Sequence, residues 1–245
     1  MIGAIAGDII GSRFEARPIK QPDFDFFHPH CRFTDDTVLT VAVADAILRG
    51  RGYAHSLQTW ARKYPNAGYG GTFYRWIWQD DPQPYNSWGN GSAMRVSAVG
   101  FAFDSPEQVL EQAERSAAIS HNHPEGIKGA QAVALAIFLA RSGHSKTQIR
   151  SSLKQRFGYD LDRTLAQIRP CYTFDVSCQG SVPEAIIAFL ESTDLLSAIG
   201  NAVSLGGDSD TQACIAGSIA EAFYGGVTDA LRTFVRHKMP DDMWR

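Results

Sequence analysis

Apolar residues recur at spacings of three and four positions along most of this chain, which is typical of helices that bury one face. Segments that alternate polar with β-branched residues, and so would predict strands, are hard to find. We therefore predict an all-α fold formed by a single domain over residues 1–245, with no internal repeat and no low-complexity tract.

The ends of the predicted helices are marked by capping residues, glycine and proline. Gly50 and Gly158 each end a predicted helix, and Pro106 suits the first position of another. The predicted helices span residues 1–11, 35–49, 55–64, 72–79, 106–119, 125–141, 145–157, 182–192, 195–205 and 229–238, and two more begin near residues 93 and 210.

Three stretches lack a clear helical pattern. Residues 18–31 are rich in proline, aspartate and aromatic residues and are predicted to form a loop. Residues 66–90 combine glycine, tryptophan, tyrosine and proline, and apart from one short helix we predict a surface loop of a length that is uncommon unless functional. Residues 160–179 are the hardest part of the chain to interpret, and we predict no element there.

The composition is that of an ordinary globular protein. Of 245 residues, 44% are hydrophobic and 20% are charged, which is enough apolar mass for a sizeable core. The formal net charge of −3 gives no reason to expect a nucleic-acid groove or an anionic membrane surface as a partner. We also expect no signal peptide and no membrane span, because residues 1–10 lack a basic region and no apolar run approaches roughly 20 residues.

The four cysteines are irregularly spaced and include no C-x-x-C pair. They are Cys31, Cys171, Cys178 and Cys214. This usage favours reduced, mostly buried thiols and argues against a zinc site. We therefore predict a cytoplasmic location.

Two dense acidic clusters lie near opposite ends of the chain, each directly before an apolar run. They are Thr-Asp-Asp-Thr at residues 34–37 and, after a glycine pair, Asp-Ser-Asp-Thr at residues 208–211. Either cluster alone is equally well explained by helix capping, and the second lacks the glycine and glutamate of an EF-hand loop. If the clusters meet in space, their carboxylates would repel unless cations neutralised them, which favours a shared site for Mg²⁺ or Mn²⁺.

Each of the other polar segments can be explained either by ligand binding or by a structural role alone. Residues 89–92, Gly-Asn-Gly-Ser, offer free backbone N–H groups that suit a phosphate, but a flexible turn capped by Ser92 explains them at least as well. From the residues alone, His121 is better explained as a helix-ending histidine that bonds the backbone than as a ligand-binding residue. The aromatic residues of the 66–90 stretch, Trp88 among them, could stack on a base, although such residues more often anchor a core or a loop.

Taken together, these strings resemble the ADP-ribosylglycohydrolase family, whose founding member is the dinitrogenase reductase-activating glycohydrolase. The matching strings occur in family order over nearly the whole chain, and the two acidic motifs with G-N-G-x-A-M-R are specific in combination. The strings are Gly7-Asp8 with Glu15, Phe33-Thr34-Asp35-Asp36-Thr37, Gly68-Tyr69-Gly70-Gly71, Gly89-Asn90-Gly91-Ser92-Ala93-Met94-Arg95, Ser120-His121, and Gly206-Gly207-Asp208-Ser209-Asp210-Thr211 with the small-residue helix at 216–220.

The resemblance implies an orthogonal helical bundle with two Mg²⁺ or Mn²⁺ ions in a cleft. By motif match, the metal ligands are Thr34, Asp35, Asp36, Asp208, Asp210 and Thr211. The substrate-binding residues implied in the same way are Gly70, Gly71, Ser87, Trp88, Gly89, Asn90, Gly91 and His121. Residues 76–88 and 160–179 fit no family pattern, which leaves the choice of substrate open.

The activity implied is hydrolysis of the glycosidic bond between ADP-ribose and an acceptor on a protein or small molecule, with arginine as the preferred acceptor. Asp35, Asp36 or Asp210 would handle the proton, with Glu15 as an alternative acid or base. The alternatives are the same chemistry on serine, a nucleic-acid base or a small metabolite, an ADP-ribose binder without turnover, or a structural relative such as the lens crystallins of the family. We expect a monomer.

Overall fold

The computed structural model describes residues 1–244, and its all-α architecture confirms the predicted fold class. The helices are α1 (Ile2–Gly11), α2 (Asp35–Arg49), α3 (Tyr53–Lys63), α4 (Gly71–Ile77), α5 (Gly91–Met94), α6 (Ser97–Ala102), α7 (Pro106–Ala118), α8 (Pro124–Arg141), α9 (Lys146–Phe157), α10 (Leu165–Ile168), α11 (Cys178–Leu190), α12 (Leu195–Val203), α13 (Ser209–Tyr224), α14 (Asp229–Lys238) and α15 (Asp241–Trp244). Within the described residues no strand forms, and an isolated bridge joins Gly89 to Ser177.

Most predicted helices begin and end within two residues of the observed ones, because local caps set their ends. Gly50 and Gly158 take left-handed φ angles of 61° and 68° at the ends of α2 and α9, as their positions predict. The helix expected near residue 93 is instead two short helices, α5 and α6. The four-residue helices α10 and α15 were not predicted, since so short a helix shows no periodicity.

The predicted start of α11 at residue 182 is wrong, because the helix begins four residues earlier at Cys178. Ser177 caps it, and its hydroxyl accepts a hydrogen bond from the N–H of Gly180 at 3.1 Å. Pro183 lies inside the helix, where it cannot donate a backbone hydrogen bond, so its position suggested a later start. The cap and the burial of nearly the whole helix offset that lost bond.

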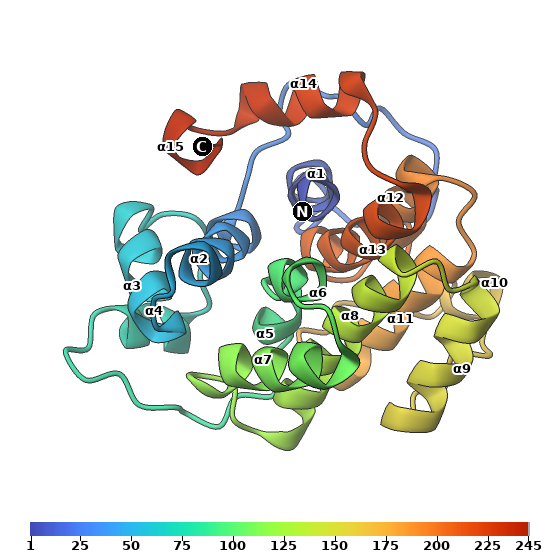
Figure 1. Cartoon of the computed structure of the whole chain (residues 1–245). Coiled ribbons are helices and arrows are strands. Elements are labelled where there is room, and N and C mark those ends of the chain that lie inside the picture. The colour runs from blue at the N-terminus through green and yellow to red at the C-terminus, as the bar shows by residue number, and fades with distance from the viewer. Residues whose placement is uncertain (245) are drawn as a thin grey trace.

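A stripe of glycines on α1 brings this helix into backbone contact with α13. A Cβ atom added at Gly3, Gly7 or Gly11 would lie 2.4, 2.0 or 2.5 Å from a backbone oxygen of α13. The three glycines are spaced four residues apart and therefore lie on one face of α1. Figure 1 shows the two helices side by side at the centre of the molecule. This close approach places the beginning of α13 beside the end of α1.

The remaining helices surround this pair and α8. Residues 132–140 of α8 are all buried, and buried apolar side chains from most of the helices form one contiguous core. In Figure 1, α2, α3 and α4 lie on one side of the α1–α13 pair, and α9, α10 and α11 lie on the other. The single core agrees with a single domain, whose bounds stay a prediction.

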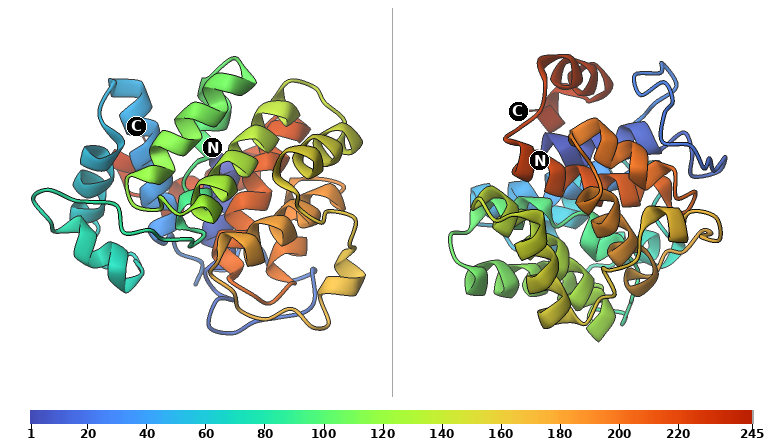
Figure 2. Two further views of the ribbon diagram at one scale, coloured as in Figure 1. Left: turned by 90° about the horizontal axis from the view of Figure 1, so that it is seen from below. Right: turned by 90° about the vertical axis from the view of Figure 1, so that its right-hand side faces the viewer.

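Helix α14 and the long loop between α1 and α2 lie on the same side of the molecule, at the top of the right-hand view of Figure 2. The rings of Phe27 and Phe234 lie 5.1 Å apart, and the Lys238 ammonium donates to the carbonyl of Pro29 at 2.6 Å. These contacts hold the loop that leads into the first acidic cluster.

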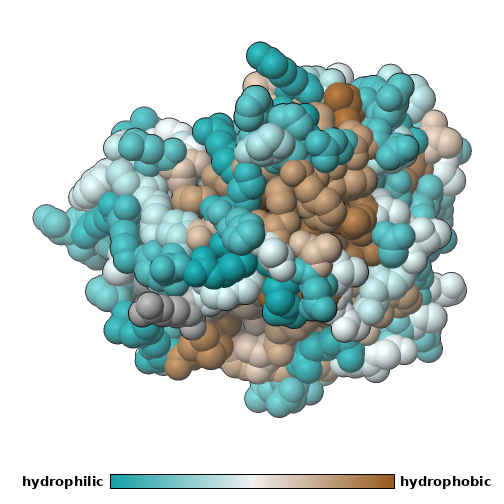
Figure 3. Space-filling model, turned by 90° about the horizontal axis from the view of Figure 1, so that it is seen from above, coloured by the Kyte–Doolittle hydropathy of each residue, from teal (hydrophilic) through white to brown (hydrophobic). Residues whose placement is uncertain are grey.

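Hydrophilic residues cover much of the face that carries α14 and surround an apolar area near its middle (Figure 3). Along residues 1–244, no helix combines the length and the apolar character that crossing a bilayer requires.

Candidate active site

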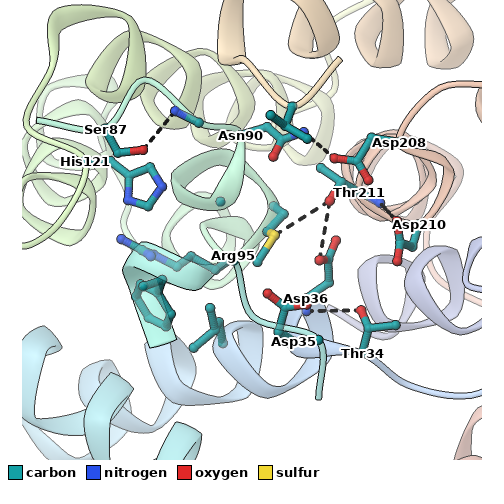
Figure 4. A pocket seen from close by; sticks show the side chains of 18 of the residues that line it. Thr34, Asp35, Asp36, Ser87, Asn90, Arg95, His121, Asp208, Asp210 and Thr211 are labelled. Atoms are coloured by element: carbon teal, nitrogen blue, oxygen red, sulfur yellow. Dashed lines mark hydrogen bonds between the residues drawn. The ribbon is translucent and has the colours of Figure 1, made fainter. Parts of the chain in front are cut away.

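A cleft of about 610 Å³ opens between the beginnings of α2 and α13 and the segment that leads into α5. Every residue that the sequence assigned to the site lines this cleft, although their roles stay predictions. These residues are Glu15, Thr34, Asp35, Asp36, Gly70, Gly71, Ser87, Trp88, Gly89, Asn90, Gly91, His121, Asp208, Asp210 and Thr211. Figure 4 shows the aspartates on one side of the cleft and His121 with Arg95 on the other.

The beginning of α2 is fixed by hydrogen bonds that leave two carboxylates facing the cleft. Thr34 caps the helix, and its hydroxyl oxygen accepts a hydrogen bond from the Asp36 N–H at 3.3 Å. Behind the cap, the fully buried carboxylate of Asp8 in α1 accepts hydrogen bonds from the N–H and the hydroxyl groups of both Thr34 and Thr37. Asp8 therefore ties α1 to the first turn of α2 and directs Asp35 and Asp36 into the cleft.

The side chain at the beginning of α13 is positioned by a residue outside the helix, Asn90. Gly206 takes a left-handed φ of 69°, which lets the chain turn sharply before the acids. Asp208 stands at the N-cap but makes no capping bond with its side chain. Its carboxylate instead accepts a hydrogen bond from the Asn90 amide at 2.8 Å. Asn90, which the sequence assigned to the substrate, thus also positions an acid.

The two acidic clusters meet in space, as the prediction of a shared metal site requires, and the metal site itself stays a prediction. Thr211 lies 175 positions after Asp36, yet its hydroxyl donates to the Asp36 carboxylate at 3.4 Å. Carboxylate oxygens of Glu15, Asp208 and Asp210 all lie within 4.8 Å of one another. Glu15, assigned from the sequence as an acid or base, therefore lies where it could share a cation with both aspartates.

No basic side chain of residues 1–244 forms an ion pair with these acids. Burial and then the neighbouring carboxylates raise the pKa values of Asp36 and Asp210 well above their ordinary range. Burial, with the charge of Asp8, likewise raises the pKa of Asp35 to about 8. One buried oxygen of Asp36, Oδ2, has no hydrogen-bond partner among these residues. A donor set of this kind fits a hard divalent cation.

The facing wall consists of the turn at residues 87–91 and His121. The Ser87 hydroxyl accepts a hydrogen bond from the Gly89 N–H at 3.1 Å and shapes the turn. A Cβ atom at Gly91 would lie 3.1 Å from Nε2 of His121. Because glycine carries no side chain, this edge of the imidazole stays open to the cleft.

Several residues at the site were not assigned from the sequence. Asp8 could have been found, because an isolated carboxylate in an apolar helix needs buried partners. Arg95 ends the G-N-G-x-A-M-R string and is fully buried beneath the cleft. Phe174 and Val176 line the cleft mouth and are 53% and 52% exposed. They come from the 160–179 stretch, where no sequence signal marks their position.

The fold of this chain is shared with a solved structure. A solved structure described as an ADP-ribosylglycohydrolase-related protein complex superposes with a TM-score of 0.72 and covers 97% of this chain and 97% of that chain. Its sequence identity of 22% makes this a likeness of fold, the orthogonal helical bundle that the sequence predicted.

The chain belongs to the ADP-ribosylglycohydrolase family, whose sequence profile matches residues 1–239. Human ADP-ribosylhydrolase ARH3 is a relative with 28% identity, covering 92% of this chain and 84% of that protein. The ADP-ribosylarginine hydrolase Tri1 of Pseudomonas putida (strain GB-1) is 26% identical, covering 92% of this chain and 69% of that protein. The protein is therefore an ADP-ribosylglycohydrolase, an enzyme that hydrolyses a glycosidic bond of ADP-ribose.

Proposed function

We propose that this enzyme is metal-dependent and releases ADP-ribose from ADP-ribosylated arginine on a protein. The observation that carries the proposal is the convergence of Asp36, Asp208 and Asp210 on one cleft, with no basic partner in the described part of the chain. Carboxylates so close together and so buried resist ionisation unless cations lie between them. The arrangement is therefore suited to holding cations beside a bound sugar.

Two Mg²⁺ or Mn²⁺ ions suit these groups, since both cations favour carboxylate and hydroxyl oxygens. The proposed ligands are Thr34, Asp35, Asp36, Asp208, Asp210 and Thr211. The Thr34 hydroxyl donates its hydrogen to Asp8 and accepts from one N–H, which leaves one lone pair for a cation. When bound, such cations supply Lewis-acid stabilisation of ribose oxygens and lower the pKa of a water molecule.

The facing wall would bind the rest of ADP-ribose. At Gly70 and Gly71 an added Cβ atom would meet nothing within 4 Å, so the backbone there is open to a phosphate group. In the 89–91 turn the N–H groups of Gly89 and Asn90 already donate to Ser87 and Val176, so the backbone donor left for an anion is that of Gly91. The half-exposed Trp88 ring offers a stacking surface. The proposed substrate-binding residues are Gly70, Gly71, Ser87, Trp88, Gly89, Asn90, Gly91 and His121.

The proton would be handled by the acidic wall. A carboxylate of Asp35, Asp36 or Asp210 takes the proton of the attacking water, while the transition state at the ribose resembles an oxocarbenium ion. Glu15 is exposed beside these groups, and burial and then the charge of Asp208 raise its pKa. Glu15 lines the cleft beside the other carboxylates, which places it to protonate the leaving nitrogen.

Arginine is the proposed acceptor because its guanidinium complements Glu15, the carboxylate on the acidic side of the cleft that is not among the proposed metal ligands. Glu15 lies at the mouth on that side, where an acceptor group would project from the bound ribose. The relative Tri1 is named for an ADP-ribosylarginine hydrolase activity. A neutral serine linkage would gain less from the same charges.

The test is an ADP-ribose release assay on ADP-ribosyl-arginine, ADP-ribosyl-serine and ADP-ribosylated nucleic acid, each with and without EDTA. We expect fastest release from the arginine conjugate, loss of activity with EDTA and recovery on adding Mg²⁺ or Mn²⁺. Asp36→Ala and Asp210→Ala should abolish release. Asp104→Ala is the matched control, because it removes a carboxylate whose side chain is 94% exposed and lies outside the cleft.

Full activity of the EDTA-treated protein on ADP-ribosyl-arginine would show that the metal-dependent mechanism is wrong. Faster release from ADP-ribosyl-serine than from the arginine conjugate would overturn the proposed acceptor and leave the class of enzyme unchanged.

A further inference from the structure

Arg95 is a buried cation without an acidic partner. Its side chain is 0% exposed, and no carboxylate within residues 1–244 lies within ion-pair distance of it. Burial lowers the pKa of Arg95 to about 10, so the guanidinium is still charged at neutral pH. Its Nη2 atom donates two hydrogen bonds of 3.0 Å, to the Ser116 carbonyl and to the Ser120 hydroxyl oxygen. Burying a charge without an opposite partner costs free energy, so the position of Arg95 calls for an explanation.

The second of these contacts orients the Ser120 hydroxyl. Arginine can only donate hydrogen bonds, so the Ser120 oxygen is the acceptor and its own hydrogen must be placed elsewhere. The Nδ1 atom of His121 lies 2.8 Å from that oxygen. Ser120 is fully buried, and among the described residues Nδ1 is the acceptor that lies within normal hydrogen-bond geometry of its hydroxyl, while the Tyr85 hydroxyl is a second, less well placed neighbour. If Nδ1 carried the proton instead, the buried Ser120 hydrogen would lose its 2.8 Å acceptor and have only the less well placed Tyr85 hydroxyl beside it.

The geometry points to a relay in which Arg95 and Ser120 hold His121 as the neutral tautomer whose proton is on Nε2. This places an N–H donor at the edge of the imidazole that faces the turn at residues 89–91. A Cβ atom at Gly91 or Gly89 would lie 3.1 or 3.6 Å from Nε2, so this nitrogen faces the space that the glycines leave free. Arg95 and Ser120 are positioning residues, because they act on a ligand only through His121.

The surroundings of His121 keep it neutral as well as oriented. Burial and then the nearby Arg95 charge lower the pKa of His121 well below its ordinary value. A neutral Nε2–H group binds an oxygen acceptor, such as a phosphate oxygen or a ribose hydroxyl, without bringing a charge to it. That the acceptor belongs to ADP-ribose rests on the proposed function, whereas the tautomer itself does not.

The tautomer can be read directly from the ¹⁵N NMR signals of the imidazole nitrogens in the full-length protein at neutral pH. We expect His121 to show an unprotonated Nδ1 and a protonated Nε2. His144 is the control within the same chain, because its Nδ1 lies 3.1 Å from the Leu139 carbonyl oxygen, which can only accept. His144 should therefore show the opposite pattern. A protonated Nδ1 in His121, or a doubly protonated ring, would overturn the inference.

Substitutions at Ser120 and Arg95 distinguish a role in orienting His121 from a role in the stability of the fold. Ser120→Ala should remove the fixed nitrogen pattern of His121 and weaken ADP-ribose binding about 2- to 10-fold by calorimetry, the loss expected for one hydrogen bond. Ser120→Thr keeps the hydroxyl and should restore both. Arg95→Met should also disturb the pattern, whereas a purely structural role of Arg95 would lower stability and leave the pattern unchanged, which would contradict the relay.

Gly91→Ala tests the direction of the donor. Its methyl group would lie 3.1 Å from Nε2 and should weaken ADP-ribose binding while the nitrogen pattern stays as in the wild type. Unchanged affinity in this variant would contradict a donor directed at this turn. If ADP-ribose does not bind the wild type at all, the proposed function fails, and the nitrogen pattern still decides the tautomer.

Discussion

The wall of the cleft at the beginnings of α2 and α13 carries several buried carboxylates without a basic partner, whereas the facing wall carries the buried Arg95 guanidinium without an acidic one. The acidic wall has one carboxylate oxygen, Asp36 Oδ2, that is buried and unbonded. On the facing wall, Nη2 of Arg95 donates to Ser116 and Ser120, which are neutral groups, while its Nε and Nη1 atoms are buried and have no partner among the described residues. The acidic wall is thus suited to binding cations, and the facing wall is suited to presenting the neutral Nε2–H donor of His121.

The difference also lies in how each wall is built. The acidic wall depends on helix ends brought together by backbone contact and by Asp8, so its geometry is set by the central packing of the fold. The facing wall depends on a turn whose glycines leave space beside His121. Changes to the acidic wall should therefore alter metal binding and stability. Changes to the facing wall should alter ligand binding alone, except at Asn90, whose amide donates to Asp208 on the acidic wall.

The largest contrast should appear in the pH dependence of stability of the EDTA-treated protein. Burial raises the pKa of Asp35 to about 8 and shifts Asp36 and Asp210 in the same direction. These carboxyls bind protons more tightly when folded, so stability should fall as the pH rises from about 4, the ordinary carboxyl pKa, toward 8. Denaturant unfolding between pH 5 and 8 measures this.

Asp36→Asn is the matched variant for that series, because the amide keeps the shape of the side chain and removes one charge. In Asp36→Asn the free energy of unfolding should fall less steeply as the pH rises. Saturating Mg²⁺ should likewise reduce this fall in the wild type. A metal-free wild type that becomes more stable from pH 5 to 8 would show that the acidic wall is not under electrostatic strain.

Gly7→Ala should damage the acidic wall through packing. The added methyl would lie 2.0 Å from the Ala213 backbone oxygen, which cannot move aside without shifting α13. We expect a loss of about 1–3 kcal/mol or more in the free energy of unfolding, as for an overpacked core. Gly52→Ala is the control, since an added Cβ there meets nothing within 4 Å. Equal stability of both variants would contradict the close α1–α13 contact.

Asn90→Ala should weaken metal binding without disturbing the fold as a whole. It removes the amide that donates to Asp208, and the loss of such an outer partner of a ligand costs about 10- to 100-fold in metal affinity. Asn201→Ala, which removes an amide bonded to a backbone carbonyl in α11, is the control. Calorimetric Mn²⁺ titrations measure both, and equal affinities would argue against a role of Asn90 in positioning Asp208.

The smallest effect is expected at the facing wall from Trp88→Ala. The ring is 52% exposed, so stability should change by no more than about 0.5 kcal/mol. Loss of aromatic stacking should weaken ADP-ribose binding roughly 2- to 10-fold, with Mn²⁺ affinity unchanged. Exposed Trp78, which lies outside the cleft, provides the control substitution. A change in Mn²⁺ affinity in Trp88→Ala would show that the two walls are not independent.

The sequence predicted those features that depend on local signals. Caps such as Thr34 and Gly50 mark helix ends, and the paired acidic clusters indicated a shared site before their distance was known. The isolated Arg95 charge could not be predicted, because whether a buried cation has a partner depends on contacts between distant segments. Phe174 reaches the cleft from an irregular stretch for the same reason, since neither periodicity nor capping fixes its path.

The most direct test of a shared metal centre is a calorimetric Mn²⁺ titration of EDTA-treated wild type, Asp36→Asn and Asp210→Asn. Asp36 lies at the beginning of α2 and Asp210 at the beginning of α13, and both carboxylates face one site. We therefore expect each substitution to lower the affinity of the same Mn²⁺ binding step that the wild type shows. If either variant keeps a Mn²⁺ site of wild-type affinity that the other variant lacks, the two clusters bind metal separately. That result would contradict a single centre between α2 and α13.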